Sequence, residues 1–220
     1  MIAAVLVALA ASGQPASIDH VLLGVSDLDA AVRDFERKTG VKPQYGGSHP
    51  GAGTRNALVS LGRGTYLELI APDPAQDTSK GFAAVLRAFK RPTPVGWAIR
   101  TSDAAALRSR LGKAGYKPGG IDPGSRKRPD GVRLSWATFE LDGLDESVEP
   151  FFIQWRTAQH PSLTAPPGCR LVALHVRTPQ AGPIIRLKRT LGLVVDVKQA
   201  AKSSLSLDLN CPKGRVSYRN

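Results

Sequence analysis

Two polar residues interrupt apolar stretches of this sequence, and both could do chemistry. Glu68 stands between Leu67 and Leu69, and His20 stands in the apolar run 18–25. Because side chains alternate between the two faces of a strand, both polar groups can point to the same side of a sheet. A buried carboxylate is costly without a partner. The pattern indicates that Glu68 meets a metal, acts as a base or contacts a bound ligand.

Three further residues could form a substrate-binding wall. Asn56 follows the glycine-rich turn 51–53, and its amide could hydrogen-bond a substrate or satisfy its own backbone. Gln154 and Trp155 end a later apolar stretch. They could supply a polar and a stacking surface, although Trp155 could equally be core packing.

Three more histidines leave two readings open. His49 could bind substrate, and His49, His160 or His175 could supply a further metal ligand. A single histidine is more often a surface or hydrogen-bonded residue. His49 and His160 precede proline in expected loops, and His175 belongs to a separate part of the chain.

Residues 17–73 predict a strand, a helix and three further strands. The first strand, 18–25, is apolar on both faces, as in a strand that a helix covers. Ser26 is expected to cap the helix, whose apolar residues recur at helical spacing until Gly40 ends it. The remaining strands of this first module are expected at 41–46, 55–61 and 65–71.

The same order of elements returns in residues 74–161. A connector helix precedes a strand at 95–101 and a helix that ends at Gly115, which marks an internal repeat. A basic loop, 117–131, stands where a second strand would be expected. The last strands of this second module are predicted at 132–141 and 151–156.

A third, shorter copy of the pattern is predicted for residues 169–220, after a linker rich in proline and glycine. Its strands are short, so this module either packs as an add-on or pairs with a second subunit, and a homodimer stays open. The whole pattern indicates an α+β fold of repeated βαβββ modules.

Several segments resemble the vicinal-oxygen-chelate superfamily. Residues 18–31, IDHVLLGVSDLDAA, are similar to its opening strand, turn and helix. Residues 49–58, HPGAGTRNAL, leading into YLELI at 66–70, resemble its glyoxalase-like proteins. So does RPDG at 128–131 followed by PFFIQW at 150–155. The resemblance covers the first two modules well, and it implies curled mixed sheets around a cup that usually holds a divalent metal.

The resemblance also implies a metal site, of which this chain carries half. In superfamily enzymes a His or Gln on the first strand and a Glu on the last strand of each module hold the metal, and His20 and Glu68 match these positions. Such ligands suit Zn, Ni, Mn or Fe. In the second module the first strand offers no imidazole or carboxylate, and Gln154 stands where a Glu is expected.

Two functions follow from the resemblance. One is a metal-dependent lyase, isomerase or dioxygenase, in which a metal at His20 and Glu68 chelates two oxygens of a small oxygenated substrate, and Glu68 is also the catalytic base. The alternative is a non-catalytic protein that sequesters a small molecule, as resistance proteins of the superfamily do. The missing half-site favours this alternative.

The chain is basic, with 30 Lys and Arg against 18 Asp and Glu in 220 residues. This charge attracts anions. The basic residues are scattered, their densest run is 126–128, and no nucleic-acid-binding signature accompanies them. We therefore expect an anionic small-molecule ligand and no specific nucleic-acid binding. Arg55, Arg128 and Arg133 could bind a carboxylate through two N–H groups or stay solvated.

Residues 1–16 resemble a signal peptide, because small residues follow an apolar run at 2–11, although no Lys or Arg precedes it. The run is too short to span a bilayer, so no transmembrane segment is expected. The sequence favours export, to the periplasm or beyond, with a cytoplasmic location as the alternative. Cys169 and Cys211 could pair in an exported protein or be two buried apolar groups.

Overall fold

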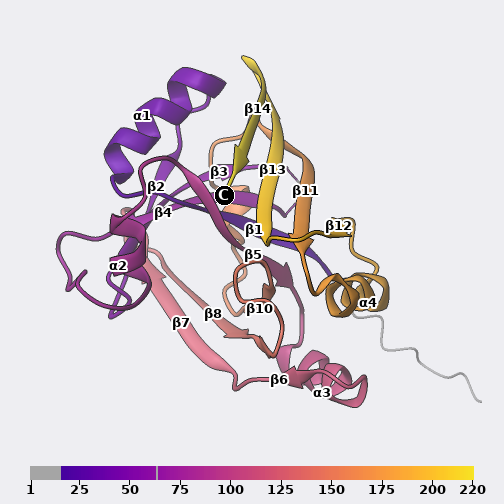
Figure 1. The fold of residues 1–220 in the computed structure, drawn as a ribbon. Coiled ribbons are helices and arrows are strands. Elements are labelled where there is room, and N and C mark those ends of the chain that lie inside the picture. The colour runs from indigo at the N-terminus through magenta and orange to yellow at the C-terminus, as the bar shows by residue number, and fades with distance from the viewer. Residues whose placement is uncertain (1–15, 63) are drawn as a thin grey trace, which may run out of the picture.

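The first module forms half of a closed β-barrel (Figure 1). The computed structural model describes residues 16–62 and 64–220, so the predicted signal peptide lies almost wholly outside the described residues. Strand β4 pairs in parallel with β1 and antiparallel with β3, whose other neighbour is β2. The elements are β1 (Ser17–Gly24), α1 (Leu28–Thr39), β2 (Gln44–His49), β3 (Thr54–Ser60) and β4 (Tyr66–Pro72).

Helix α1 shows how local sequence sets the ends of an element. Its N-cap is Asp27, one residue after the predicted Ser26, and the Asp27 carboxylate accepts from the Ala30 amide at 3.0 Å. Gly40 ends the helix at a φ of 80°, which a residue without Cβ adopts at little cost. The buried stripe includes Val32 and Phe35, so the helix covers the outer face of the sheet.

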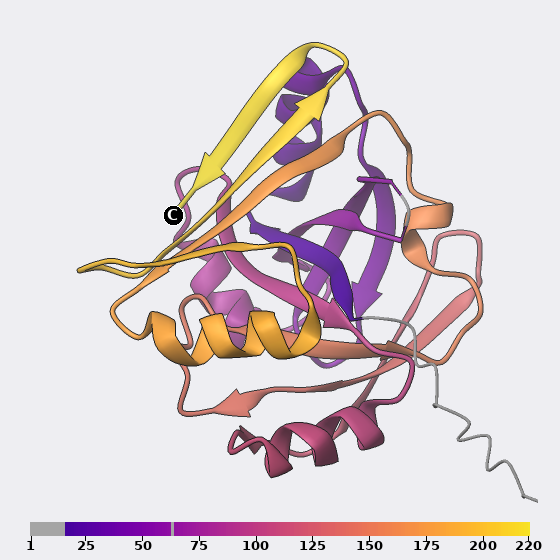
Figure 2. The same ribbon diagram turned by 90° about the vertical axis from the view of Figure 1, so that its right-hand side faces the viewer.

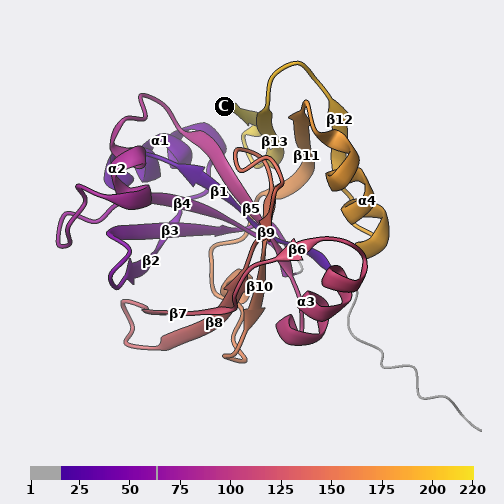
Figure 3. The ribbon, with the colours of Figure 1, turned by 60° about the horizontal axis from the view of Figure 1, so that its bottom comes forward.

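The second module repeats this arrangement and closes the barrel (Figure 3). Its strands continue the order β1-β4-β3-β2-β7-β8-β10-β5, and two short strands, β6 and β9, pair separately. The elements are the connector helix α2 (Gly81–Arg87), then β5 (Thr93–Arg100), α3 (Ala104–Lys113), β6 (Lys117–Pro118), β7 (Asp122–Lys127), β8 (Arg133–Phe139), β9 (Leu141–Asp142) and β10 (Pro150–Trp155).

The basic loop expected at 117–131 instead contains the strand β7 and the short strand β6. β7 pairs with β8 along its whole length, and one pair, Ser48 with Lys127, joins it to β2. Its sequence, DPGSRK, has little intrinsic preference for a strand. Pairing with β8 and closure of the barrel therefore decide its conformation.

The third module packs against the barrel as an add-on (Figure 2). Its sheet has the order β12-β11-β13-β14. Val176, Leu205 and Leu207 are fully buried and belong to the same core as Phe35 and Trp97 of the barrel modules, so the apolar face of this sheet is covered within the chain. The elements are β11 (Arg170–Thr178), α4 (Ala181–Leu191), β12 (Asp196–Gln199), β13 (Ser204–Cys211) and β14 (Gly214–Arg219). Across the residues that the structure describes, no helix has the length and apolarity to cross a membrane.

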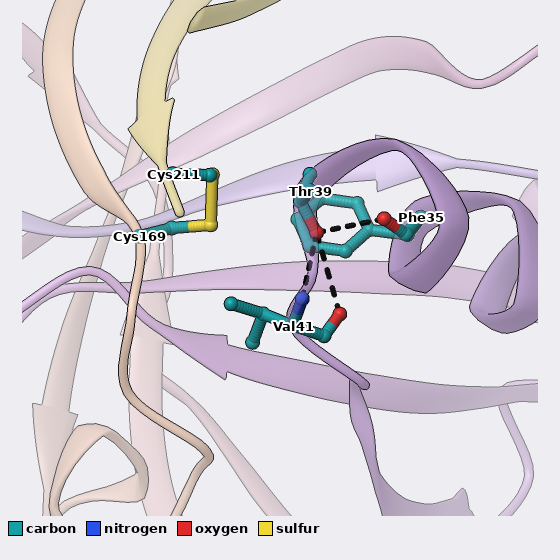
Figure 4. The surroundings of a disulfide bond; sticks show 5 residues. All are labelled: Phe35, Thr39, Val41, Cys169 and Cys211. Atoms are coloured by element: carbon teal, nitrogen blue, oxygen red, sulfur yellow. Dashed lines mark hydrogen bonds between the residues drawn. A yellow bond between two sulfur atoms is a disulfide. The ribbon is translucent and has the colours of Figure 1, made fainter. Parts of the chain in front are cut away.

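A disulfide joins Cys169 to Cys211 within the third module, next to the end of α1 (Figure 4). The hydroxyl of Thr39 donates to the Phe35 carbonyl and accepts from the Val41 amide, and the Lys213 amide donates to the Thr39 carbonyl at 3.1 Å. The two cysteines are therefore paired in the structure and are not two separate buried thiols.

Removal of this disulfide should destabilise the fold. The bond closes a loop with a sequence separation of 42 residues, and constraining such a loop in the unfolded chain is worth about 4 kcal/mol. We expect the double variant Cys169→Ala/Cys211→Ala to lose stability of this order in urea unfolding. The wild type in reducing agent should show the same loss, and the double variant should not respond to reducing agent. Equal stability of oxidised and reduced wild type would contradict this.

Glu149, just before β10, gives a second prediction about stability. Burial raises the pKa of Glu149 to about 7, and the carboxylates of Glu140, Glu146, Asp145 and Asp142 add to the effect. The folded pKa exceeds the ordinary value of 4.5. The contribution of protonated Glu149 to the free energy of unfolding is therefore fully present below pH 4.5 and is lost as the pH rises toward 7. Because the side chain is partly exposed, solvent screens its charge, and the loss of stability at high pH is roughly 1 kcal/mol. The variant Glu149→Gln should melt roughly 2–4 °C higher than wild type at pH 8 and equally at pH 4; an equal difference at both values would contradict the assignment.

Candidate functional site

A β-bulge in β1 brings two polar side chains into the barrel. Ile18 pairs with Ile99 and His20 pairs with Ala98, so Asp19 is an extra residue on β1. Such a bulge changes the direction of the side chains near it. Asp19 and His20 are both buried, and Asp19 Oδ1 lies 2.7 Å from His20 Nδ1.

The carboxylate of Glu68 lies between two imidazoles. In the parallel register of β1 and β4, Tyr66 is opposite His20 and Glu68 is two residues further along, so Glu68 shares the inner face with His20. Glu68 Oε2 is 3.7 Å from His20 Nε2, and Oε1 is 3.8 Å from His49 Nε2. The Asn56 amide donates to Oε1 at 2.9 Å. With 6% of its surface exposed, Glu68 is a buried carboxylate held by neutral groups and histidines.

The hydrogen-bond partners assign the proton positions of the two imidazoles. An ionised Asp19 can only accept, so His20 Nδ1 carries a proton and Nε2 faces Glu68. His49 Nδ1 is 2.9 Å from the Thr54 hydroxyl, and Asn56 Nδ2 donates to His49 Nε2 at 3.2 Å. Burial lowers the pKa of His49. His49 is therefore a neutral imidazole at neutral pH.

Asp19 connects His20 to the linker that follows β10. Its Oδ2 is 2.9 Å from His160 Nε2 and accepts from Trp155 Nε1 at 3.2 Å. Burial alone would raise the pKa of Asp19, but hydrogen bonds from His160 and His20 outweigh it and hold the pKa well below its usual range. His160 also caps the short 3-10 helix Pro161–Leu163. One carboxylate thus orients His20 and fastens the linker over the barrel.

Arg126 places a positive charge beside this group. Its side chain is 3% exposed, and its guanidinium donates to the Gly46 carbonyl. Burial lowers the pKa of Arg126, and the nearby negative charge of Glu68 opposes that shift. A Cβ at Gly46 would overlap Asn56 Oδ1 and crowd Arg126, so glycine is required where β2 passes them.

Four of the predicted site residues come together, namely His20, His49, Asn56 and Glu68. Trp155 joins them through Asp19 and lies 5.3 Å from Trp136 between ring centroids. On the second-module side, Phe151 lies 5.4 Å from His20 between ring centroids. The inner wall is therefore polar on one side and aromatic on the other.

Two of the candidates lie elsewhere. Gln154 accepts from the Ala104 amide at 3.0 Å and donates to the Ser102 carbonyl at 2.9 Å. Neighbouring residues on a strand face opposite ways, so Gln154 points to the outer face of the barrel, where it caps α3. The prediction that Gln154 lines the substrate wall is therefore wrong. His175 lies in the third module between Asp196 and Asp208.

A cavity of about 550 Å³ opens beside His49. His49 forms part of its wall and its Nε2 also lies 3.8 Å from Glu68 Oε1, so one imidazole separates the cavity from the buried carboxylate. The other residues around it that carry polar or aromatic groups are Ser125, Arg133, Ser135, Trp136 and Arg156.

The side chains around Glu68 offer a possible but incomplete donor set for a divalent metal. His20 and Glu68 are close enough to share an ion, but the Asn56 amide hydrogens point at Glu68 Oε1 and His49 Nε2, where lone pairs would face the metal. In residues 16–62 and 64–220, no group of three or more His, Cys, Asp and Glu side chains is arranged to hold a metal. The arrangement as it stands does not fit a metal, and metal binding at His20 and Glu68 stays a prediction.

The barrel of paired βαβββ modules and its inward His20 and Glu68 define a protein of the vicinal-oxygen-chelate class. The model of the glyoxalase-like domain family matches residues 18–192. The chain belongs to this family, as its sequence motifs indicated.

The chain is similar to several solved structures, of which the first supports the fold. A hypothetical protein from Staphylococcus aureus is 16% identical with a TM-score of 0.65, and the match covers 93% of this chain and 85% of that one. Methylmalonyl-CoA epimerase from Mycobacterium tuberculosis is 25% identical over 67% of this chain and 92% of its own, with a TM-score of 0.46. A hypothetical protein from Bacillus halodurans is 15% identical over 66% and 96%, with a TM-score of 0.49. Among curated proteins, no sequence matches the chain.

Proposed function

We propose that this protein is an isomerase or lyase that moves a proton on small oxygenated anions, with Glu68 as the catalytic base. The observation that carries the proposal is the position of the Glu68 carboxylate, buried between His20 Nε2 and His49 Nε2, with His49 separating it from a cavity. Burying a carboxylate without a direct Lys or Arg partner is costly. Such groups gather at sites where protons are transferred.

The proposed step begins with a substrate carbon next to a carbonyl. Glu68 takes the proton from this carbon, the C–H electron pair moves into an enolate, and the proton bound to Glu68 then returns to carbon. Asn56 holds Glu68 Oε1 in place at 2.9 Å. The buried guanidinium of Arg126 offers a fixed positive charge to the negative charge that develops. Neutral His49 can accept or return a proton at the cavity edge.

Proton exchange in D2O tests the proposal. Small 2-hydroxy and 2-oxo carboxylates are incubated with the protein, and loss of the C–H signal next to the carbonyl is followed by ¹H NMR. We expect exchange with at least one probe after chelator treatment, because no step above uses a metal. Exchange that appears only after Zn, Ni, Mn or Fe is added would instead support the predicted metal dependence at His20 and Glu68. Absence of exchange with every probe and metal would contradict the proposal.

Sequestration without chemistry is the second candidate. The aromatic wall formed by Phe151, Trp136 and Trp155 favours it, because such a wall binds a ligand without taking part in proton transfer. A sequestering protein would be stabilised by its ligand in a thermal-shift assay and would leave that ligand's C–H signal intact in D2O.

We also propose that the protein is exported. The disulfide between Cys169 and Cys211 supports this, because disulfides persist in oxidising compartments. Cell fractionation with an antibody against the folded protein tests the proposal, and a protein confined to the cytoplasm with reduced cysteines would contradict it.

A further inference from the structure

The cavity beside His49 carries positive charge that the proposed proton transfer does not use. Its wall is built from β7, from β8 and from the residue that follows β10. Arg133 and Arg156 both border this cavity and are exposed. Two guanidinium groups at one hollow repel each other unless an anion lies between them.

Neither arginine is paired with an acid. Over the described part of the chain, no carboxylate oxygen comes within 4.0 Å of a nitrogen of Arg133 or Arg156, whereas Arg55, Arg128 and Arg177 each have such a partner. Arg133 Nη2 donates to the Ser125 hydroxyl at 3.0 Å, and the Arg156 amide donates to the Ser135 carbonyl at 2.9 Å. These bonds hold both residues at the cavity wall and leave N–H groups for a ligand.

A flat aromatic surface lines the same cavity as the two arginines. The indole of Trp136 lies over Gly124, where a Cβ would overlap it, and the His49 ring meets it edge-on with 6.1 Å between centroids. Trp136 and Gly124 both line the cavity. A ligand held by the arginines would therefore extend along Trp136 to His49, and His49 contacts Glu68.

We propose that Arg133 and Arg156 form an anion subsite that selects the substrate. The inference rests on the proposed function of Glu68 and names its substrate class, a short oxygenated molecule that ends in a carboxylate or a phosphate. Arginine suits either end because its planar fork matches both groups. The anionic end binds at the arginines, and the carbon that loses its proton lies toward Glu68.

Titration calorimetry with malate and 3-phosphoglycerate distinguishes a carboxylate from a phosphate end, and dimethyl malate is the neutral control. We expect at least one of the two anions to bind and the diester not to bind. A hydrogen bond to a charged group is worth enough that Arg133→Gln and Arg156→Gln should each weaken binding about 10-fold or more. Circular dichroism checks that both variants fold.

Two matched variants make the result specific. Arg219→Gln removes the charge of an exposed arginine on β14. If this variant weakened anion binding equally, the net charge of the protein would explain the loss and the subsite proposal would be overturned. Glu68→Gln should keep anion binding, which separates failure of the base from failure of the subsite. Absence of binding by both anions, or unchanged binding in Arg133→Gln and Arg156→Gln, would also overturn the proposal.

Discussion

Replacing Glu68 by Gln is expected to slow proton exchange by a factor of about 10²–10⁴, the usual contribution of a positioned acid or base. The amide keeps the size of the side chain, and its oxygen can still accept from Asn56, which now donates to Glu68 Oε1 at 2.9 Å. Its nitrogen cannot take a proton at neutral pH. The rate of C–H loss in D2O, measured against wild type with the same probe, gives the factor.

The control for this variant is Glu36→Gln, which makes the same change on helix α1, away from the barrel interior. It should exchange at the wild-type rate. If the Glu68→Gln protein exchanged at the wild-type rate, Glu68 would not be the catalytic base. Loss of both exchange and ligand binding would mean that the variant has disturbed the site as a whole, and the Asn56 contact would then be the first to examine.

The barrel fold could be predicted from the sequence because its signals are local and repeated. Asp27 and Gly40 mark the ends of α1, and the same pattern returns in the second module. Strand alternation also predicted that His20 and Glu68 face one interior, where the structure has them 3.7 Å apart. Short-range periodicity is therefore enough to predict a helix or strand whose own residues carry the pattern.

Three features of the site depend on pairing between distant segments. Asp19 enters the barrel through a bulge relative to β5, and strand alternation alone places it on the opposite face from His20. Arg126 belongs to a segment that sequence preference assigns to a loop, and it is buried only because β7 closes the barrel. Gln154 faces outward because the residues of β10 alternate, so of these two neighbours it is Trp155 that reaches the interior. No signal in one sequence fixes such a register.

Replacing Asp19 by Asn is expected to impair both stability and exchange. Asp19 accepts from His20, His160 and Trp155, and an Asn oxygen cannot serve three donors while its NH₂ group faces one of them. Losing a buried hydrogen bond to a charged group costs about 1.5–3 kcal/mol. His20 would then accept from the Asn NH₂ at Nδ1 and turn an Nε2 proton toward Glu68, which makes Glu68 a weaker base. Urea unfolding and the pH profile of exchange measure the two effects.

The pH dependence separates this charged contact from simple packing. Because the folded pKa of Asp19 lies below its ordinary value of 3.8, its contribution to stability is complete above pH 3.8 and is lost as the pH falls below that value. The stability difference between wild type and Asp19→Asn should therefore be large at pH 7 and shrink in acid. As a control, His160→Gln loosens the linker but leaves the bond between Asp19 and His20, so it should destabilise the fold and keep the pH profile of exchange. An unchanged profile in Asp19→Asn would mean that Asp19 holds the linker without positioning His20.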